Sequence, residues 1–199
     1  NISEAMRYGD YHTPEQTIPA EPCTDEHGKP LLWESCMTLN DHWGYARDDH
    51  DYKSPAQVVR MLVDCVSKNG NLLLNVGPTA KGEIPPESVR VLEAVGDWMS
   101  ANADGIYGCG ATDLPKPDWG RFTKKPGTLY AHVFDKPMGP IALAGLAGKV
   151  KRARLVADGS EVSIQTPWMV RHNTADAFLN LPGVKLPDAI DTVIRLELA

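Results

Sequence analysis

The run Asn71-Leu72-Leu73-Leu74-Asn75-Val76 decides the fold class of the first part of the chain. It is a short apolar run, bounded by Gly70 on one side and by Gly77-Pro78 on the other. Such a run is typical of a strand that is buried on both faces of a parallel sheet. The two asparagines that flank Leu72 to Leu74 are expected to bind loop backbone, because a buried amide needs hydrogen-bond partners.

Helices are predicted on both sides of this strand. Residues 54–68 carry a capping serine, a proline at the first helical position and an apolar stripe that ends at Asn69-Gly70. A second helix is predicted to begin near Pro86 and to end near Asp104-Gly105. The order helix, strand, loop and helix predicts an α/β fold, preceded by long loops around short strands.

Beyond Gly110 the pattern changes to short runs in which apolar and polar residues alternate, as in antiparallel strands. These runs are 129–134, 140–143, 152–156, 161–165 and 193–198. Turns that contain glycine separate them, which predicts an all-β antiparallel sandwich of roughly 80 residues. The predicted boundary lies near Thr112, giving domains 1–112 and 113–199.

Composition limits the partners. The 199 residues carry a formal net charge of −6, so a nucleic-acid partner is not expected, whereas a neutral sugar is allowed. No apolar run approaches the roughly 20 residues that cross a bilayer, so no membrane partner is expected. The four cysteines form no C-x-x-C pair and are predicted to be isolated thiols. Because the chain begins at Asn1, either a leader has been removed or the sequence starts within a longer gene product, and the second is the favoured expectation.

Three stretches resemble bacterial family 29 α-L-fucosidases in their order and spacing. They are Gly9-Asp10-Tyr11-His12-Thr13-Pro14-Glu15-Gln16, Trp33-Glu34-Ser35-Cys36-Met37-Thr38-Leu39-Asn40 with Trp43-Gly44-Tyr45, and Asn71-Leu72-Leu73-Leu74-Asn75-Val76-Gly77-Pro78. Segments 119–122 and 186–188 are similar to the family's C-terminal domain. The resemblance implies a partial (β/α) barrel, the second half of a TIM-like barrel, followed by the sandwich.

The resemblance also implies an activity, namely hydrolysis of terminal α-L-fucose with retention through a covalent intermediate, without a metal or organic cofactor. The substrate would be a fucosylated glycan or a small fucoside. The family's nucleophilic aspartate is expected upstream of this chain, so the missing N-terminal half of the barrel would lie on the same or another chain. A homo-oligomer is the other expected partner. A bacterial periplasmic or secreted location fits glycan degradation. The alternative is a non-catalytic carbohydrate-binding or structural remnant of such an enzyme.

Two glutamates are candidates for the catalytic acid/base. Glu15 lies in a loop after Tyr11, and its alternative interpretation is a carboxylate in the first turn of a helix capped by Thr13, with Pro14 at the first position. Glu34 follows the apolar residues 31–33, so it is expected to lie against an indole wall, a surrounding that suits a general acid. Its alternative is a buried structural carboxylate paired with Arg47.

The expected substrate contacts follow from the resemblance and from their place in loops. Trp43 would lie against the apolar edge and C6 methyl group of fucose, and Trp33 would form a wall rather than a stacking platform. Arg7, Tyr8 and His12 are candidates for binding sugar hydroxyls, because loops that follow barrel strands gather substrate contacts. The run Arg47-Asp48-Asp49-His50-Asp51 could suggest a metal site, but a solvated acidic loop ahead of a helix is the favoured interpretation.

Overall fold

The computed structural model describes residues 9–199, which divide at Met99 and Ser100 into two compact units. Of the predicted site residues, Arg7 and Tyr8 lie outside the described residues. No helix in the described part is long and apolar enough to span a membrane. The domain boundary between residues 112 and 113 stays a prediction.

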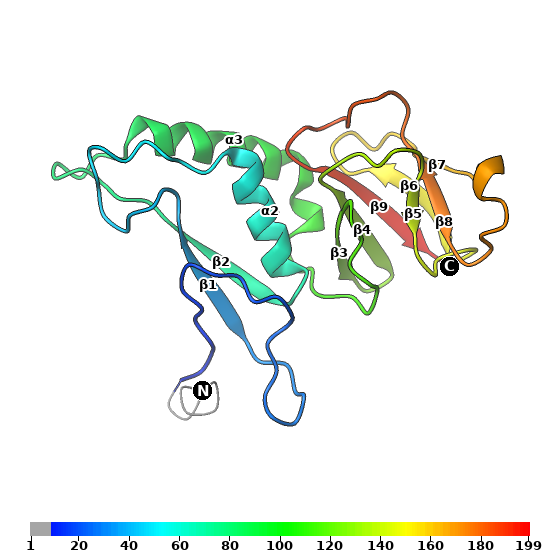
Figure 1. The fold of residues 1–199 in the computed structure, drawn as a ribbon, viewed down its shortest axis with the longest axis horizontal. Coiled ribbons are helices and arrows are strands. Elements are labelled where there is room, and N and C mark those ends of the chain that lie inside the picture. Colours follow the sequence, from blue (N-terminus) through cyan, green and yellow to red (C-terminus); the bar gives the residue numbers. More distant parts are fainter. Residues whose placement is uncertain (1–8) are drawn as a thin grey trace. The chain divides into compact units, whose positions relative to one another are not determined.

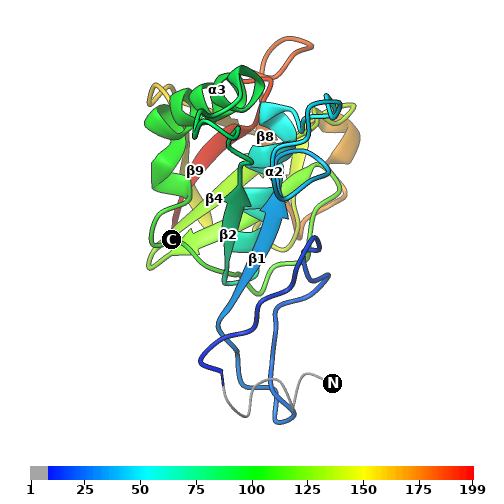
Figure 2. The same cartoon turned by 90° about the vertical axis from the view of Figure 1, so that its left-hand side faces the viewer.

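The first unit is built on a parallel strand pair. Strands β1 (Trp33–Thr38) and β2 (Gly70–Asn75) run side by side in the same direction (Figures 1 and 2). Thr38 pairs with Asn75 at their carboxyl ends. The predicted strand is therefore confirmed, one residue earlier than expected. Parallel strands need a crossover connection, and helix α2 (Pro55–Val66) supplies it.

Local sequence explains where the helices begin. Ser54 Oγ accepts the Gln57 backbone N–H at 3.2 Å, and the Gln57 amide oxygen accepts the Ser54 N–H at 2.8 Å. This reciprocal capping box satisfies two N–H groups that the first helical turn leaves free. Helix α3 (Pro86–Asn102) follows and continues into the 3₁₀ helix η1 (Ala103–Gly105). The helical segment therefore ends where the sequence predicted, near Asp104-Gly105.

The core of the first unit lies on one face of the strand pair. Leu39, Val58 of α2 and Val91 of α3 form a buried cluster, and Leu74 of β2 packs against it. Because the strand partner of Leu74 is Met37, alternate residues of β1 and β2 point to this helix-covered face. The residues between them point to the other face.

The second unit is an antiparallel sandwich. Its four-stranded sheet has the order β3-β4-β9-β6 and its three-stranded sheet the order β5-β8-β7. The strands are β3 (Gly120–Lys125), β4 (Thr128–Val133), β5 (Ile141–Leu143), β6 (Val150–Leu155), β7 (Ser163–Ile164), β8 (Ala177–Asn180) and β9 (Thr192–Leu198). Buried residues of both sheets, among them Phe122, Ile194, Ile141 and Leu179, form one core. The predicted all-β domain is thus observed, although the sequence did not predict β3 and β8 as strands.

A buried polar group lies within this sandwich. His132 Nδ1 is 2.7 Å from Asp191 Oδ2, and both side chains are fully buried. His132 Nε2 lies 3.1 Å from Thr123 Oγ1, which bonds Gly105 O at 2.7 Å. These contacts join β3, β4 and the end of η1 inside the unit, so His132 has a structural position.

Candidate functional site

The face of the strand pair that points away from α2 carries polar and exposed side chains. Glu34 pairs with Asn71 and Cys36 pairs with Leu73 in the parallel register, so all four share this face. Leu73 is 50% exposed, which is unusual for a leucine in the middle of a parallel strand. Among the described residues, then, no second layer covers this face.

Glu15 lies on the same face, in an extended segment that runs parallel to β1. The Cys36 N–H donates to Pro14 O at 3.0 Å, and the Gln16 N–H donates to Cys36 O at 2.9 Å. These two bonds flank Glu15 and make it the partner of Cys36. The helical interpretation of Thr13 and Pro14 is wrong, because pairing with β1 holds the segment extended.

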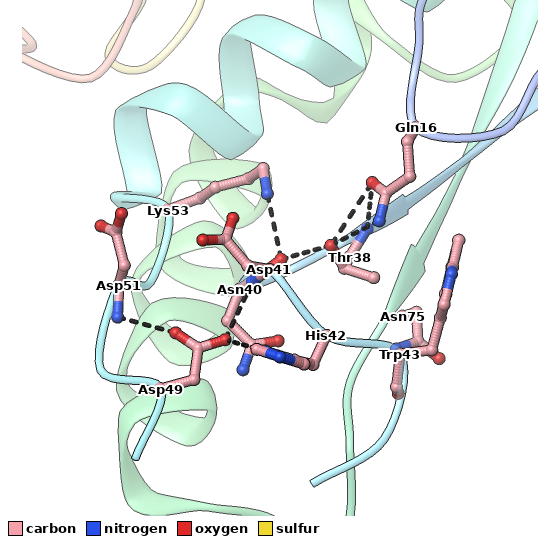
Figure 3. A network of polar contacts seen from close by, with 10 residues as sticks. All are labelled: Gln16, Thr38, Asn40, Asp41, His42, Trp43, Asp49, Asp51, Lys53 and Asn75. Atoms are coloured by element: carbon pink, nitrogen blue, oxygen red, sulfur yellow. Dashed lines mark hydrogen bonds and ion pairs between the residues drawn. The ribbon is translucent and has the colours of Figure 1, made fainter. Parts of the chain in front are cut away.

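Gln16 fixes the end of this segment. Its backbone has φ 54°, in the left-handed region that side-chain-bearing residues rarely adopt. Its side-chain amide donates to Thr38 Oγ1 at 2.9 Å and accepts the Thr38 N–H at 3.3 Å (Figure 3). The carboxyl end of β1 therefore holds the residue next to Glu15 in place.

Glu34 lies nearer the amino ends of the two strands. It lines a pocket of about 400 Å³ together with residues at or just before the amino ends of the two strands and of the first segment: Asp10, Tyr11, Leu32, Trp33, Asn69 and Asn71. No ion pair joins Glu34 to Arg47 in the described part of the chain. Glu34 is half-buried rather than buried and has no ion pair to Arg47, so the alternative of a buried, Arg47-paired carboxylate is wrong.

Trp33 packs on the opposite side of β1 from Glu34. A Cβ atom at Gly70 would lie 2.2 Å from the Trp33 indole, so only glycine fits beside this ring. The indole N–H donates to Lys68 O at 3.1 Å, and the side chain is buried. Successive strand residues point to opposite faces, so the expectation that this indole lies against the Glu34 carboxyl is wrong. Trp33 instead supports the start of the strand pair.

A loop at the carboxyl end of β1 is organised by Asp49. The Asp49 carboxylate accepts bonds from His42 Nδ1 at 2.7 Å, from the Asp41 N–H at 3.1 Å and from the Asp51 N–H at 3.0 Å (Figure 3). The bond from His42, followed by the backbone bonds, lowers the pKa of Asp49 below its usual value. No group of three or more metal-ligating side chains occurs among residues 9–199. The acidic run is a closed, hydrogen-bonded loop.

Trp43 lies in this loop and is 40% exposed. Its backbone oxygen accepts a hydrogen bond from the side-chain amide of Asn75 at 2.8 Å (Figure 3). The expectation that Asn75 binds loop backbone is thereby confirmed. His12 is half-buried, and its backbone pairs with Leu32 and Glu34. The structure thus brings Glu15 and Glu34 to one face of the sheet, with Trp43 beyond the carboxyl end of β1, whereas His12 pairs with Trp33 and lies on the opposite face.

Comparison with known proteins identifies the family. The α-L-fucosidase family model matches residues 1–104, slightly more than half of the chain. The chain belongs to the α-L-fucosidase family. It is 31% identical to an α-L-fucosidase of Dictyostelium discoideum over 78% of this chain, and 30% identical to that of Branchiostoma floridae over 73%. It spans only 35% and 37% of the lengths of these two relatives.

Solved structures of the family have the same fold. The α-L-fucosidase isoenzyme 1 of Paenibacillus thiaminolyticus is 60% identical, with a TM-score of 0.94 over 96% of this chain and 45% of that one. A Bacteroides thetaiotaomicron GH29 α-L-fucosidase, solved as a trapped covalent intermediate in complex with 2-fluoro-fucosyl fluoride, is 28% identical. Its TM-score is 0.81 over 96% of this chain and 44% of that one. The resemblance to family 29 inferred from the motifs is confirmed.

Sequence reasoning missed the residues that organise this region. Gln16, Thr38 and Asp49 were not singled out as positioning groups, although Thr38 is the last residue of β1 and Asn75 the last of β2. Polar residues at the carboxyl ends of parallel strands are the available signal, because barrel sites form there. The hydrogen bonds themselves join residues up to 32 positions apart and leave no local pattern.

Proposed function

We propose that the protein carrying this chain is an α-L-fucosidase that removes terminal α-L-fucose from glycans or small fucosides with retention of configuration. The family match over residues 1–104, with Glu15 and Glu34 on one uncovered sheet face, carries the proposal. Because the chain spans about a third of its curated relatives, the activity is proposed for the whole protein.

The chemistry requires two carboxyl groups about 5 to 5.5 Å apart. One attacks the anomeric carbon, and the other protonates the departing oxygen and then removes a proton from the incoming water. The covalent intermediate trapped in the Bacteroides relative supports the same route here. We assign the nucleophile to an aspartate in sequence upstream of this chain and the acid/base to the uncovered face.

The strand pair would form part of a barrel. The segment His12–Gln16, β1 and β2 are parallel neighbours, with helices after β1 and β2. This arrangement fits the later strands of a (β/α) barrel in domain 1–112, followed by the sandwich in 113–199. In such a barrel the uncovered face would point to the interior and the loops after the strands to the substrate.

Position favours Glu15 over Glu34 as the acid/base. Glu15 pairs with Cys36, two residues beyond Glu34, so it lies about 7 Å nearer the carboxyl end of the sheet at 3.3 Å per residue. Catalytic groups of barrels lie at that end. Gln16, fixed by Thr38, gives Glu15 the rigid support that a proton-transferring group needs. Glu34, in the pocket at the amino ends, remains the rival candidate.

The sugar contacts in this proposal come from the same end. Trp43 presents an exposed ring for the apolar edge and C6 methyl group of fucose, where an indole offers broad contact at little entropy cost. Arg7 and Tyr8 are proposed to bind hydroxyl groups from the first segment. The proposal does not extend to His12, because His12 pairs with Trp33 at the amino end of β1, on the opposite face from the two glutamates. Trp33 contributes a supporting wall rather than a contact surface.

The test is hydrolysis of 4-nitrophenyl α-L-fucoside followed by proton NMR. The proposal expects turnover with α-L-fucose as the anomer formed first, before mutarotation. If β-L-fucose appeared first, the mechanism would be inverting and the two-carboxylate geometry proposed above would be wrong. If the folded protein showed no turnover, it would be a carbohydrate-binding or structural remnant.

A further inference from the structure

We propose that Asn75 and the His42–Asp49 pair are positioning residues that hold the backbone on both sides of Trp43 and so set selectivity for the C6 methyl group. This inference rests on the proposed fucosidase activity and on the proposed contact of Trp43 with fucose. Asn75 and Asp49 are bound to the loop itself, and neither is proposed to touch the sugar.

The first anchor precedes Trp43. His42 donates from Nδ1 to Asp49, whose side chain is 8% exposed, whereas the His42 side chain is 59% exposed. The same carboxylate accepts the N–H groups of Asp41 and Asp51, which lie ten residues apart. One nearly buried carboxylate thus closes the loop that carries Trp43, with three hydrogen bonds to groups on both of its arms.

The second anchor lies at Trp43 itself and just after it. The Asn75 amide donates to Trp43 O at 2.8 Å, and the backbone oxygen of Asn75 accepts the Leu39 N–H at 3.0 Å. Gly77 packs so closely that a Cβ atom there would lie 2.5 Å from the carbonyl carbon of Gly44. The carboxyl end of β2 therefore holds both the start of the loop and the segment around Trp43.

These anchors matter because a ring contact depends on position. A methyl group in an apolar contact contributes about 1–3 kcal/mol of discrimination, or roughly 10–200-fold in kcat/KM. Displacing a contact group by about 1 Å can remove much of this effect. A loosened loop would lower the advantage of fucose over the same sugar without its methyl group, while the reacting carboxylates would stay in place.

The experiment compares 4-nitrophenyl α-L-fucoside with 4-nitrophenyl β-D-arabinopyranoside, which has the same ring without the C6 methyl group. The readout is the ratio of the two kcat/KM values. We expect Trp43→Ala to lower this ratio about 10-fold or more. Asn75→Ala and Asp49→Asn should lower it in the same direction, about 3-fold to 10-fold, because each removes one anchor.

Asp176→Asn is the matched control. Asp176 is also a loop carboxylate that accepts a backbone N–H, from Gly145 at 2.9 Å, and a side-chain N–H, from Asn173 at 2.7 Å. These bonds lower its pKa as they do that of Asp49, but Asp176 lies in the sandwich. The Asp176→Asn variant should leave the ratio unchanged. An equal loss on both substrates in Asn75→Ala and Asp49→Asn, with the ratio unchanged, would overturn the inference.

Hydrogen–deuterium exchange separates this inference from the proposed function. Exchange of amides in residues 41–45 should accelerate about fivefold or more in Asn75→Ala and Asp49→Asn, on the basis of about 1 kcal/mol for each lost bond. Exchange in the sandwich should not change. Absence of fucoside turnover would sink the proposed function, whereas unchanged exchange at residues 41–45 would sink the anchoring role by itself.

Discussion

Two histidine–aspartate pairs, one in each unit, have the same 2.7 Å separation and opposite surroundings. His132–Asp191 is fully buried in the sandwich, among contacts that join strands. His42–Asp49 lies at the end of β1, with the histidine largely exposed. The difference shows that the same chemical pair serves as a core element in one unit and as a loop anchor in the other. The burial of the pair, and not the pairing itself, decides which of these two roles it has.

The two sheets differ in the same way. The sandwich buries side chains of both its sheets in one core, so its inner faces are closed. The β1–β2 pair packs α2 on one face and leaves Glu34, Cys36 and Leu73 on the other. A closed core contributes stability, whereas an uncovered face with carboxylates is available for chemistry.

The largest expected effect on stability comes from the buried pair. Asp191→Ala should lower the free energy of unfolding of the sandwich by about 3–5 kcal/mol, because it leaves a buried imidazole without its partner. Asp49→Ala should cost clearly less than Asp191→Ala, since the His42 partner is exposed to water and an exposed pair contributes little. Urea unfolding followed by tryptophan fluorescence measures both. Equal losses in the two variants would break the comparison.

The two faces predict a second contrast between matched leucines. Leu179→Ala in the sandwich core should cost about 2–5 kcal/mol, from lost burial and the cavity left behind. In the 199-residue chain by itself, Leu73→Ala on the uncovered face should change stability by about 0.5 kcal/mol or less. The same unfolding measurement tests both. A cost for Leu73→Ala as large as that for Leu179→Ala would mean that the face is covered in the complete protein.

The smallest effect is a pH dependence at Asp49. The hydrogen bond from His42 lowers the pKa of Asp49 in the folded state, so ionised Asp49 stabilises the fold above the unfolded-state pKa, which lies near 4. This contribution is lost as the pH falls through the lowered folded-state pKa. The difference in Tm between wild type and Asp49→Asn should therefore be present at pH 7 and shrink below about pH 4. A difference that grew on acidification would contradict this sign.

Local patterns predicted the elements whose stability is local. The Ser54 cap, the first-position proline and the apolar run of β2 each appear within a few residues of sequence, and each is observed. Thr13-Pro14-Glu15 also has the pattern of a helix start, but pairing of this segment with β1 overrides it. The hydrogen bonds to β1 that hold this segment extended join residues far apart in the sequence, so no local pattern predicts them.

The sequence predicted which residues belong to the candidate site, but not how their side chains are placed relative to one another. Glu15, Glu34 and Trp43 follow from the motifs, but the sequence did not reveal that Trp33 points away from Glu34 or that Gln16 and Asn75 hold the ends of the strands. The direction of Trp33 and the contacts of Gln16 and Asn75 depend on the strand register. A slip of one residue would turn each strand side chain to the other face of the sheet.

The central claim is that the uncovered face supplies the acid/base and that Glu15 is that residue. Azide rescue of the Glu15→Gln and Glu34→Gln variants tests it most directly. An acid/base variant should lose about 10²- to 10⁴-fold on a fucoside with a poor leaving group. It should keep forming the intermediate from 2,4-dinitrophenyl α-L-fucoside, and azide should then release α-L-fucosyl azide and restore turnover. We predict this behaviour for Glu15→Gln alone. Azide rescue of Glu34→Gln instead, or near-normal activity of both variants, would contradict the assignment.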